Sequence, residues 1–163
     1  MDIGPMGAVT IRFAKPEDCD SILAAHVGAI RELCRAEYSE TQLAGWAERL
    51  TPAGYLPAIA KNTFLVAENE GRVVGFAEFA PSRGEVVAMY VQPKHARSGI
   101  GTMLFREIER LATAEGVTAM HLSSSLSAVS FYERLGFVAG PRSVHRLGNG
   151  TGIPCVAMTK AAA

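Results

Sequence analysis

The sequence contains little cysteine and carries no excess of charge of either sign. Its three cysteines, Cys19, Cys34 and Cys155, are an odd number without CxxC spacing, which argues against a disulfide framework and a cysteine zinc site. We therefore expect reduced thiols in a cytoplasmic protein, and no metal. The 16 basic residues balance 16 acidic ones, so the composition indicates neither nucleic acid nor a membrane as a partner. A net charge near zero permits a homodimer through the last strands.

Long apolar runs and targeting signals are also missing. No stretch approaches the ~18 apolar residues that a membrane-spanning helix needs. Residues 1–7 lack the basic region and apolar core of a signal peptide, and we expect them to be frayed. The 163 residues are 48% hydrophobic, which predicts one domain, over residues 8–163, with a core of its own.

Hydrophobic periodicity predicts an alternation of strands and helices along this domain. Alternating or continuous apolar runs indicate strands, and apolar spacings of three and four indicate helices. We expect strands at 9–13, 64–68, 73–79, 86–91, 120–123, 137–146 and 154–158, and helices from Pro16, after Ser39, after Thr51, over 101–115 and over 126–135. This order predicts an α/β or α+β domain with a mixed sheet flanked by helices.

The stretch from Gly84 to Phe105 has the most informative pattern. A continuous apolar strand, Val86–Val91, ends at Gln92-Pro93, because proline has no N–H to donate to a sheet. A basic loop and Gly99-Ile100-Gly101 then lead into a helix. Free N–H groups and the positive end of the dipole at a helix start favour an anion. Glycines let that anion approach the backbone, although the same pattern also suits a helix packed tightly on a strand.

Two common phosphate motifs do not fit this loop. A P-loop would need lysine after its last glycine, but Thr102 follows Gly101. A dinucleotide fingerprint would need a third glycine at the position of Leu104. The sequence therefore does not predict an ATP-binding or NAD-binding protein.

A second block, Leu126 to Phe137, lies beyond the next predicted strand and reads LSAVSFYERLGF. Arg97-Ser98-Gly99-Ile100-Gly101 resembles the acyl-CoA pyrophosphate loop of the GNAT superfamily of N-acetyltransferases, Arg/Gln-x-x-Gly-x-Gly/Ala. The second block is similar to that family's Asn-x-x-Ala/Pro-x-x-Phe-Tyr-x-x-x-Gly-Phe. The looser resemblance extends from Val9 to Lys160. It implies a mostly antiparallel central sheet and acetyl-CoA as co-substrate.

The resemblance also implies which residues contact coenzyme A. Backbone groups of a strand that spreads away from its neighbour would bind the pantetheine amides, and N–H groups of the glycine loop would bind the pyrophosphate. The implied cofactor-binding residues are Met89, Tyr90, Val91, Arg97, Ser98, Gly99, Ile100, Gly101, Thr102, Ser127 and Phe131. Two positions depart from the family pattern. Ala96 stands where the family has Arg or Gln, with Arg97 one residue later, and Ser127 replaces Asn.

Tyr132 falls on the tyrosine that serves the family as general acid for the departing thiolate, although it also suits a packed aromatic on an amphipathic helix. The general base is open. Glu78 lies in an otherwise apolar strand, where a carboxyl pKa should rise. Glu85 or solvent are the alternatives, because Ser123-Ser124-Ser125 occupies the place where some relatives carry a glutamate.

Several residues of the early helices have two interpretations. His26 lies on an apolar helical stripe. It is either a half-buried histidine bonded to a backbone carbonyl or a residue of the acceptor site. By resemblance, Tyr38, Trp46 and Tyr55 are candidate walls of the acceptor pocket. Their helical spacing equally predicts core positions.

These patterns favour an acetyl-CoA-dependent N-acetyltransferase acting on a primary amine of a small molecule or on an exposed protein or peptide amine. The amine would attack directly in a ternary complex, with Tyr132 as general acid. The alternative is a GNAT-fold module that binds acyl-CoA without turnover and has a sensory or regulatory role.

Overall fold

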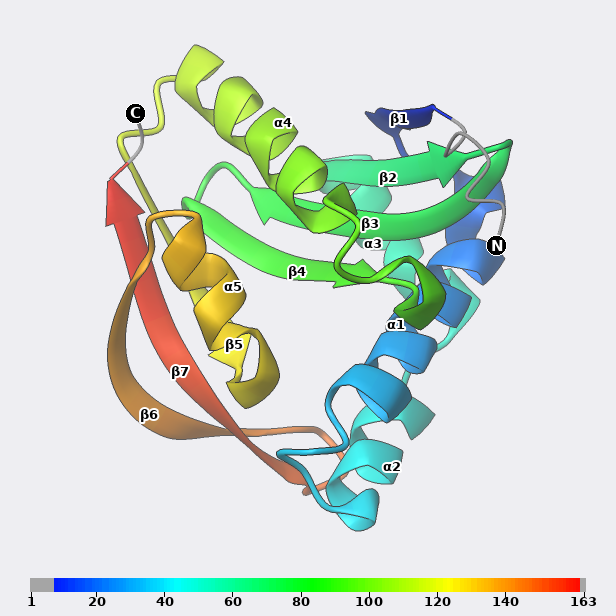
Figure 1. The fold of residues 1–163 in the computed structure, drawn as a ribbon, viewed down its shortest axis with the longest axis vertical. Coiled ribbons are helices and arrows are strands. Elements are labelled where there is room, and N and C mark those ends of the chain that lie inside the picture. The colour runs from blue at the N-terminus through cyan, green and yellow to red at the C-terminus, as the bar shows by residue number, and fades with distance from the viewer. Residues whose placement is uncertain (1–7, 162–163) are drawn as a thin grey trace, which may run out of the picture.

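The computed structural model describes residues 8–161, so the expected fraying of residues 1–7 lies outside the described part of the chain. Within it, seven strands form one sheet in the order β1-β2-β3-β4-β5-β7-β6 (Figure 1). The strands are β1 Val9–Phe13, β2 Thr63–Asn69, β3 Arg72–Ala80, β4 Glu85–Val91, β5 Ala119–Ser125, β6 Val138–Arg146 and β7 Gly152–Ala161.

All neighbouring strands of this sheet pair antiparallel except β4 and β5, which are parallel. The expected mixed, mostly antiparallel sheet in a single α/β domain is therefore confirmed. A parallel pair needs a crossover connection, and the helix over 100–114 supplies it.

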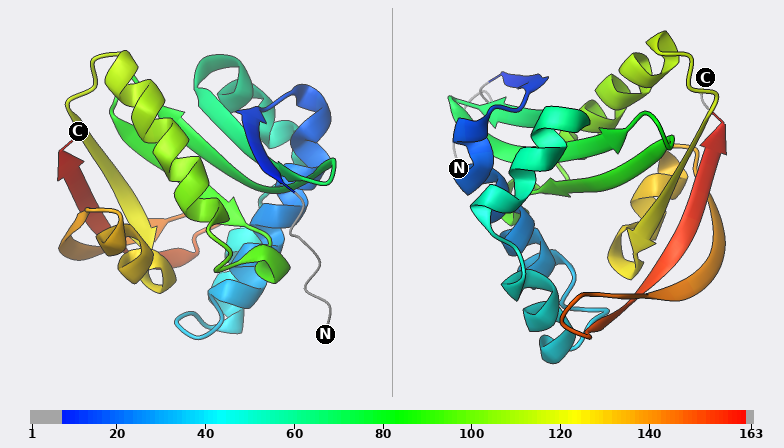
Figure 2. Two further views of the ribbon diagram at one scale, coloured as in Figure 1. Left: turned by 45° about the horizontal axis from the view of Figure 1, so that its top comes forward. Right: turned by 180° about the vertical axis from the view of Figure 1, so that it is seen from behind.

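Helices cover both faces of the sheet. The longer helices are α1 Cys19–Leu33, α2 Glu40–Glu48, α3 Leu56–Lys61, α4 Ile100–Ala114 and α5 Val129–Arg134, and the short 3-10 turns are η1 Pro16–Asp18, η2 Pro52–Tyr55, η3 Pro93–His95 and η4 Leu126–Ala128. Figures 1 and 2 show α4 and α5 on one face, with α1 and α3 on the other. The hairpin of β6 and β7 reaches across to α2.

Three apolar clusters follow from this layering. The largest joins α4 and α5 to the sheet and contains Leu104, Phe105 and Ile108. A second lies under α1, where Phe64 and Phe76 stack at 5.6 Å. We call the third the end cluster: it joins α1, α2 and the β6–β7 turn, and consists of Ile30, Cys34, Tyr38, Leu43, Trp46, Ala47, Leu147 and Ile153. Tyr38 and Trp46 are buried in the end cluster, as their helical spacing predicted, and neither lines the cavity between β4 and β5.

Local sequence signals explain where the helices begin. The Ser39–Gln42 capping box is confirmed, since each side chain bonds the other residue's N–H. Thr51 caps the next turn as expected. Helix α4 starts at Ile100, one residue earlier than predicted, because Gly99 takes φ +88° as its N-cap.

Two further observations concern the cysteines and the lengths of the helices. Cys19, Cys34 and Cys155 are free and buried. Within residues 8–161, none of the helices is both long and apolar enough to cross a membrane.

Candidate active site

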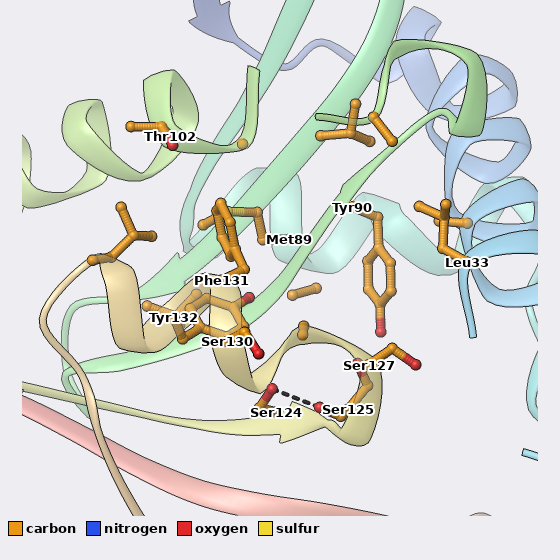
Figure 3. A pocket seen from close by; sticks show the side chains of 18 of the residues that line it. Leu33, Met89, Tyr90, Thr102, Ser124, Ser125, Ser127, Ser130, Phe131 and Tyr132 are labelled. Atoms are coloured by element: carbon orange, nitrogen blue, oxygen red, sulfur yellow. Dashed lines mark hydrogen bonds between the residues drawn. The ribbon is translucent and has the colours of Figure 1, made fainter. Parts of the chain in front are cut away.

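The strands β4 and β5 diverge and leave an opening between them. The two strands share a single register pair, Glu85 with His121, and the His121 N–H donates to the carbonyl of Gly84 over 2.9 Å. Beyond that point the strands diverge, so the β4 edge that faces β5 has no strand to pair with. The opening is a cavity of about 1030 Å³ (Figure 3).

Side chains of β4 alternate across this opening. Met89 and Val91 pack against the large cluster on the α4 face, whereas Ala88 and Tyr90 pack on the α1 face. All four line the cavity. The unpaired edge of β4 therefore offers backbone N–H and C=O groups to a ligand that lies along it, as an added strand would.

The glycine loop closes the α4 side of the cavity. Arg97 and Gly99 take left-handed φ values of +60° and +88°, which turn the chain into α4. Gly101 allows Phe131 to approach, because a Cβ on it would lie 3.0 Å from the Phe131 ring. The first N–H groups of α4 have no helical carbonyl to bind and are free for an anion.

The structure does not place all of the predicted loop residues in the cavity. Arg97, Gly99, Gly101 and Thr102 line it, together with Ala96. The Ile100 side chain is 2% exposed and belongs to the core. The Ser98 hydroxyl donates to the carbonyl of His95, so Ser98 and Ile100 reach a ligand only through backbone groups.

The charged side chains that line the cavity have one sign. They are Arg97, Arg106 and Arg134, and none of the described lining residues is a carboxylate. Arg106 pairs with Glu109 at 2.9 Å, while Arg97 and Arg134 have no ion pair in residues 8–161. This lining attracts a polyanion and gives a negatively charged ligand no repulsive contact.

Tyr132 lies on α5, and its side chain forms part of the wall of the cavity. It is 7% exposed, and its ring packs edge-on to Phe131 and Phe137. Its hydroxyl has no hydrogen-bond partner in the described chain, and burial raises its pKa. Tyr132 is therefore protonated at neutral pH and available as a proton donor.

Tyr90 is the second tyrosine that lines the cavity, and its hydroxyl points toward the segment that carries Ser127 (Figure 3). Its ring lies 4.3 Å from that of His26. His26 is buried, and its Nδ1 is 2.8 Å from the Tyr55 hydroxyl. The prediction that His26 bonds to a backbone carbonyl is therefore wrong. The His26 ring lies among Tyr55, Phe76 and Tyr90 rather than against its own helix.

The carboxylates considered as bases lie outside the cavity lining. Glu78 pairs across the sheet with Ala88, on the face that carries Phe64, and accepts a 2.8 Å hydrogen bond from Asn62. Burial raises its pKa. Glu85 pairs with Arg83 at 3.2 Å.

Serine hydroxyls line the β5 side of the cavity. Ser127 lines it and donates a 3.1 Å hydrogen bond to Glu37. Ser123, Ser124 and Ser125 also line it, and the Ser124 hydroxyl donates to the carbonyl of Ser125 over 2.7 Å.

Sequence reasoning missed two arginines and part of α1. Arg106 follows Thr102 by four residues, and Arg134 follows Phe131 by three, so helical spacing places each on the same face as a predicted ligand residue. Ala29, Leu33 and Cys34 also line the cavity. The sequence gives no signal for these three, since only the packing of α1 against β4 brings them there.

Known proteins resemble this chain in sequence and in fold. The model of the acetyltransferase (GNAT) domain family matches residues 34–162. A mycothiol acetyltransferase from Nocardia farcinica is 31% identical over 105 residues, which are 63% of this chain and 32% of that protein. The chain thus spans about a third of that relative's length.

Solved structures extend the likeness to nearly all of the chain. A GCN5-related N-acetyltransferase from Rhodopseudomonas palustris, also described as an aminotransferase of class II, has 29% identity and a TM-score of 0.89 over 98% of this chain and 99% of its own. The PaiA N-acetyltransferase from Thermoplasma acidophilum, in complex with coenzyme A, shows the same fold at 21% identity, with a TM-score of 0.77 over 94% of this chain and 99% of its own. The chain belongs to the GNAT family of acetyltransferases.

Proposed function

We propose that this chain is an N-acetyltransferase that moves an acetyl group from acetyl-CoA to a primary amine, on a small molecule or on an exposed protein or peptide. One observation carries the proposal: the unpaired edge of β4, the start of α4 and the Tyr132 hydroxyl all face one cavity lined by cations. The residues present fit coenzyme A. Free N–H groups and Arg97 suit its phosphates, and the edge of β4 suits the pantetheine amides.

The reaction would proceed by direct attack in a ternary complex. The neutral amine forms the new C–N bond at the thioester carbonyl, and the C–S bond breaks. The N–H of Met89 would stabilise the negative charge that develops on the carbonyl oxygen. Tyr132 would give its proton to the departing thiolate and recover one from solvent.

The amine must also lose a proton, and Glu78 is the carboxylate that we propose for it. Glu78 lies one strand away from the cavity lining, paired with Ala88. It would therefore act through intervening water and not by direct contact. Its raised pKa makes it a better proton acceptor from an ammonium group than an exposed carboxylate.

Two measurements test this function. Calorimetric titration with acetyl-CoA should show binding, whereas ATP should bind weakly or not at all. Thiol release should then appear with at least one member of a panel of amines. Binding without thiol release from any amine would favour the acyl-CoA-binding module, and no binding would overturn both functions.

A single substitution tests the acid. Tyr132→Phe removes the hydroxyl but keeps the ring against Phe131 and Phe137. We expect kcat to fall by about 10²-fold, the usual contribution of a positioned acid, while the Kd of acetyl-CoA stays within a factor of about two. An unchanged kcat would remove Tyr132 from the mechanism.

A further inference from the structure

Because β4 and β5 diverge, side chains from other elements must hold the far ends of the two strands apart. At the near end the strands are joined by the Glu85–His121 pair. At the far end, Tyr90 of β4 and Leu126, the residue that follows β5, both pack against the end cluster. The end cluster, with side chains from α1 and the α1–α2 loop, therefore contacts both diverging strands at the far end of the opening.

Tyr38, in the α1–α2 loop, makes the polar connections within this cluster. Its hydroxyl accepts a 2.9 Å hydrogen bond from the Leu126 N–H and donates a 2.6 Å hydrogen bond to the carbonyl of Pro154 on β7. The ring is 5% exposed and lies edge-on to Trp46 at 5.5 Å. A hydroxyl that both accepts and donates fixes its two partners relative to each other as well as to the ring.

One partner of this hydroxyl, Leu126, lies at the base of α5. Leu126 starts η4, which runs directly into α5 and its residues Phe131 and Tyr132. Glu37, next to Tyr38, accepts a second hydrogen bond from η4 through the hydroxyl of Ser127. The α1–α2 loop thus binds two consecutive residues of η4, while α1 itself packs on β4.

We propose that Tyr38 is a positioning residue, whose hydroxyl holds α5 at the separation from β4 that acetyl transfer requires. Tyr38 does not line the cavity, so it acts through α5. Without the hydroxyl, η4 and α5 would lose their fixed distance from β4, and the Tyr132 hydroxyl would no longer meet the departing thiolate. The loop at the start of α4, which would bind the phosphates, is not attached to Tyr38 and would keep its place.

The test compares Tyr38→Phe with Asn149→Ala. Asn149 connects the β6–β7 turn to α2 by a 2.7 Å hydrogen bond to the carbonyl of Gly45, so its loss loosens the same end of the molecule without touching η4. We expect Tyr38→Phe to lower kcat at least tenfold and to change the Kd of acetyl-CoA less than threefold. Asn149→Ala should keep the wild-type kcat. A wild-type kcat in Tyr38→Phe, or an equal loss in Asn149→Ala, would overturn the proposal.

Because kcat depends on the proposed function, hydrogen exchange supplies a readout that needs no turnover. The amides of Leu126 and of residues 129–134 should exchange faster in Tyr38→Phe than in the wild type, and at the wild-type rate in Asn149→Ala. Unchanged exchange in Tyr38→Phe would overturn the proposal even if the wild type acetylates no amine. A wild type without thiol release but with the expected exchange would refute the proposed function alone.

A second variant covers the case in which Tyr38→Phe does not fold. Glu37→Ala removes the other connection to η4, and Glu37 is exposed. Faster exchange of residues 126–128 in Glu37→Ala supports the role of the loop, and wild-type exchange together with a wild-type kcat overturns it.

Discussion

Acid should destabilise this protein through His26, a buried ring that the proposed chemistry does not use. The side chain is 7% exposed and lies among Tyr55, Phe76 and Tyr90. Burial, with a smaller contribution from the charge of Arg49, lowers its pKa from 6.5 to about 3. The imidazole is therefore neutral in the folded protein, whereas it protonates in the unfolded chain near pH 6.5.

The sign and size of the effect follow from this difference. Between pH 6.5 and 3 the unfolded chain binds one proton more than the folded protein at His26, so the free energy of unfolding falls as the pH falls. Each pH unit costs about 1.4 kcal/mol. From pH 7 to pH 5 the loss from His26 is about 2 kcal/mol, a large part of the 5–15 kcal/mol that typically stabilises a domain.

Urea denaturation at pH 7 and pH 5 measures this loss, with the fluorescence of Trp46, the only tryptophan, as the probe. In His26→Asn the side chain no longer titrates, although lost packing should lower its stability at pH 7. We expect the variant to lose about 2 kcal/mol less than the wild type between the two pH values. His145→Asn, on the exposed strand β6, should show the wild-type loss. An equal loss in His26→Asn and the wild type would refute the reasoning.

Two further predictions concern the cofactor loop and Glu78. Gly101→Val should weaken acetyl-CoA binding at least tenfold by calorimetry, because the new Cβ would lie 3.0 Å from the Phe131 ring. Gly148→Ala is the control, since Gly148 has open space around it. Wild-type affinity in Gly101→Val would contradict the prediction. Glu78→Gln keeps an acceptor for Asn62 but removes a carboxyl whose pKa is raised in the folded state. Since the folded protein binds that proton more tightly than the unfolded chain, the wild type loses this stabilisation as the pH rises above about 4.5. The Tm of Glu78→Gln minus that of the wild type should therefore increase from pH 4 to pH 7.5, and a constant difference would show that burial does not act on Glu78.

Local signals in the sequence determined much of this protein. The apolar run of β4, the glycine turn and the spacing of α4 are properties of neighbouring residues, so they were visible without a structure. The Ser39–Gln42 capping box is another such case. The order of strands and helices, together with two motifs, was enough to predict the fold class and the family.

Only the tertiary structure decided which residues meet in the cavity. Leu33 and Cys34 line the cavity because α1 packs against β4. The Ile100 side chain lies outside the cavity because it points into the core from the first turn of α4. Tyr38 lies 88 residues before Leu126 in the chain, and no local pattern predicts that its hydroxyl binds that N–H. Periodicity reports which face of an element is apolar, whereas a site depends on how separate elements pack, and that is fixed by the whole core at once.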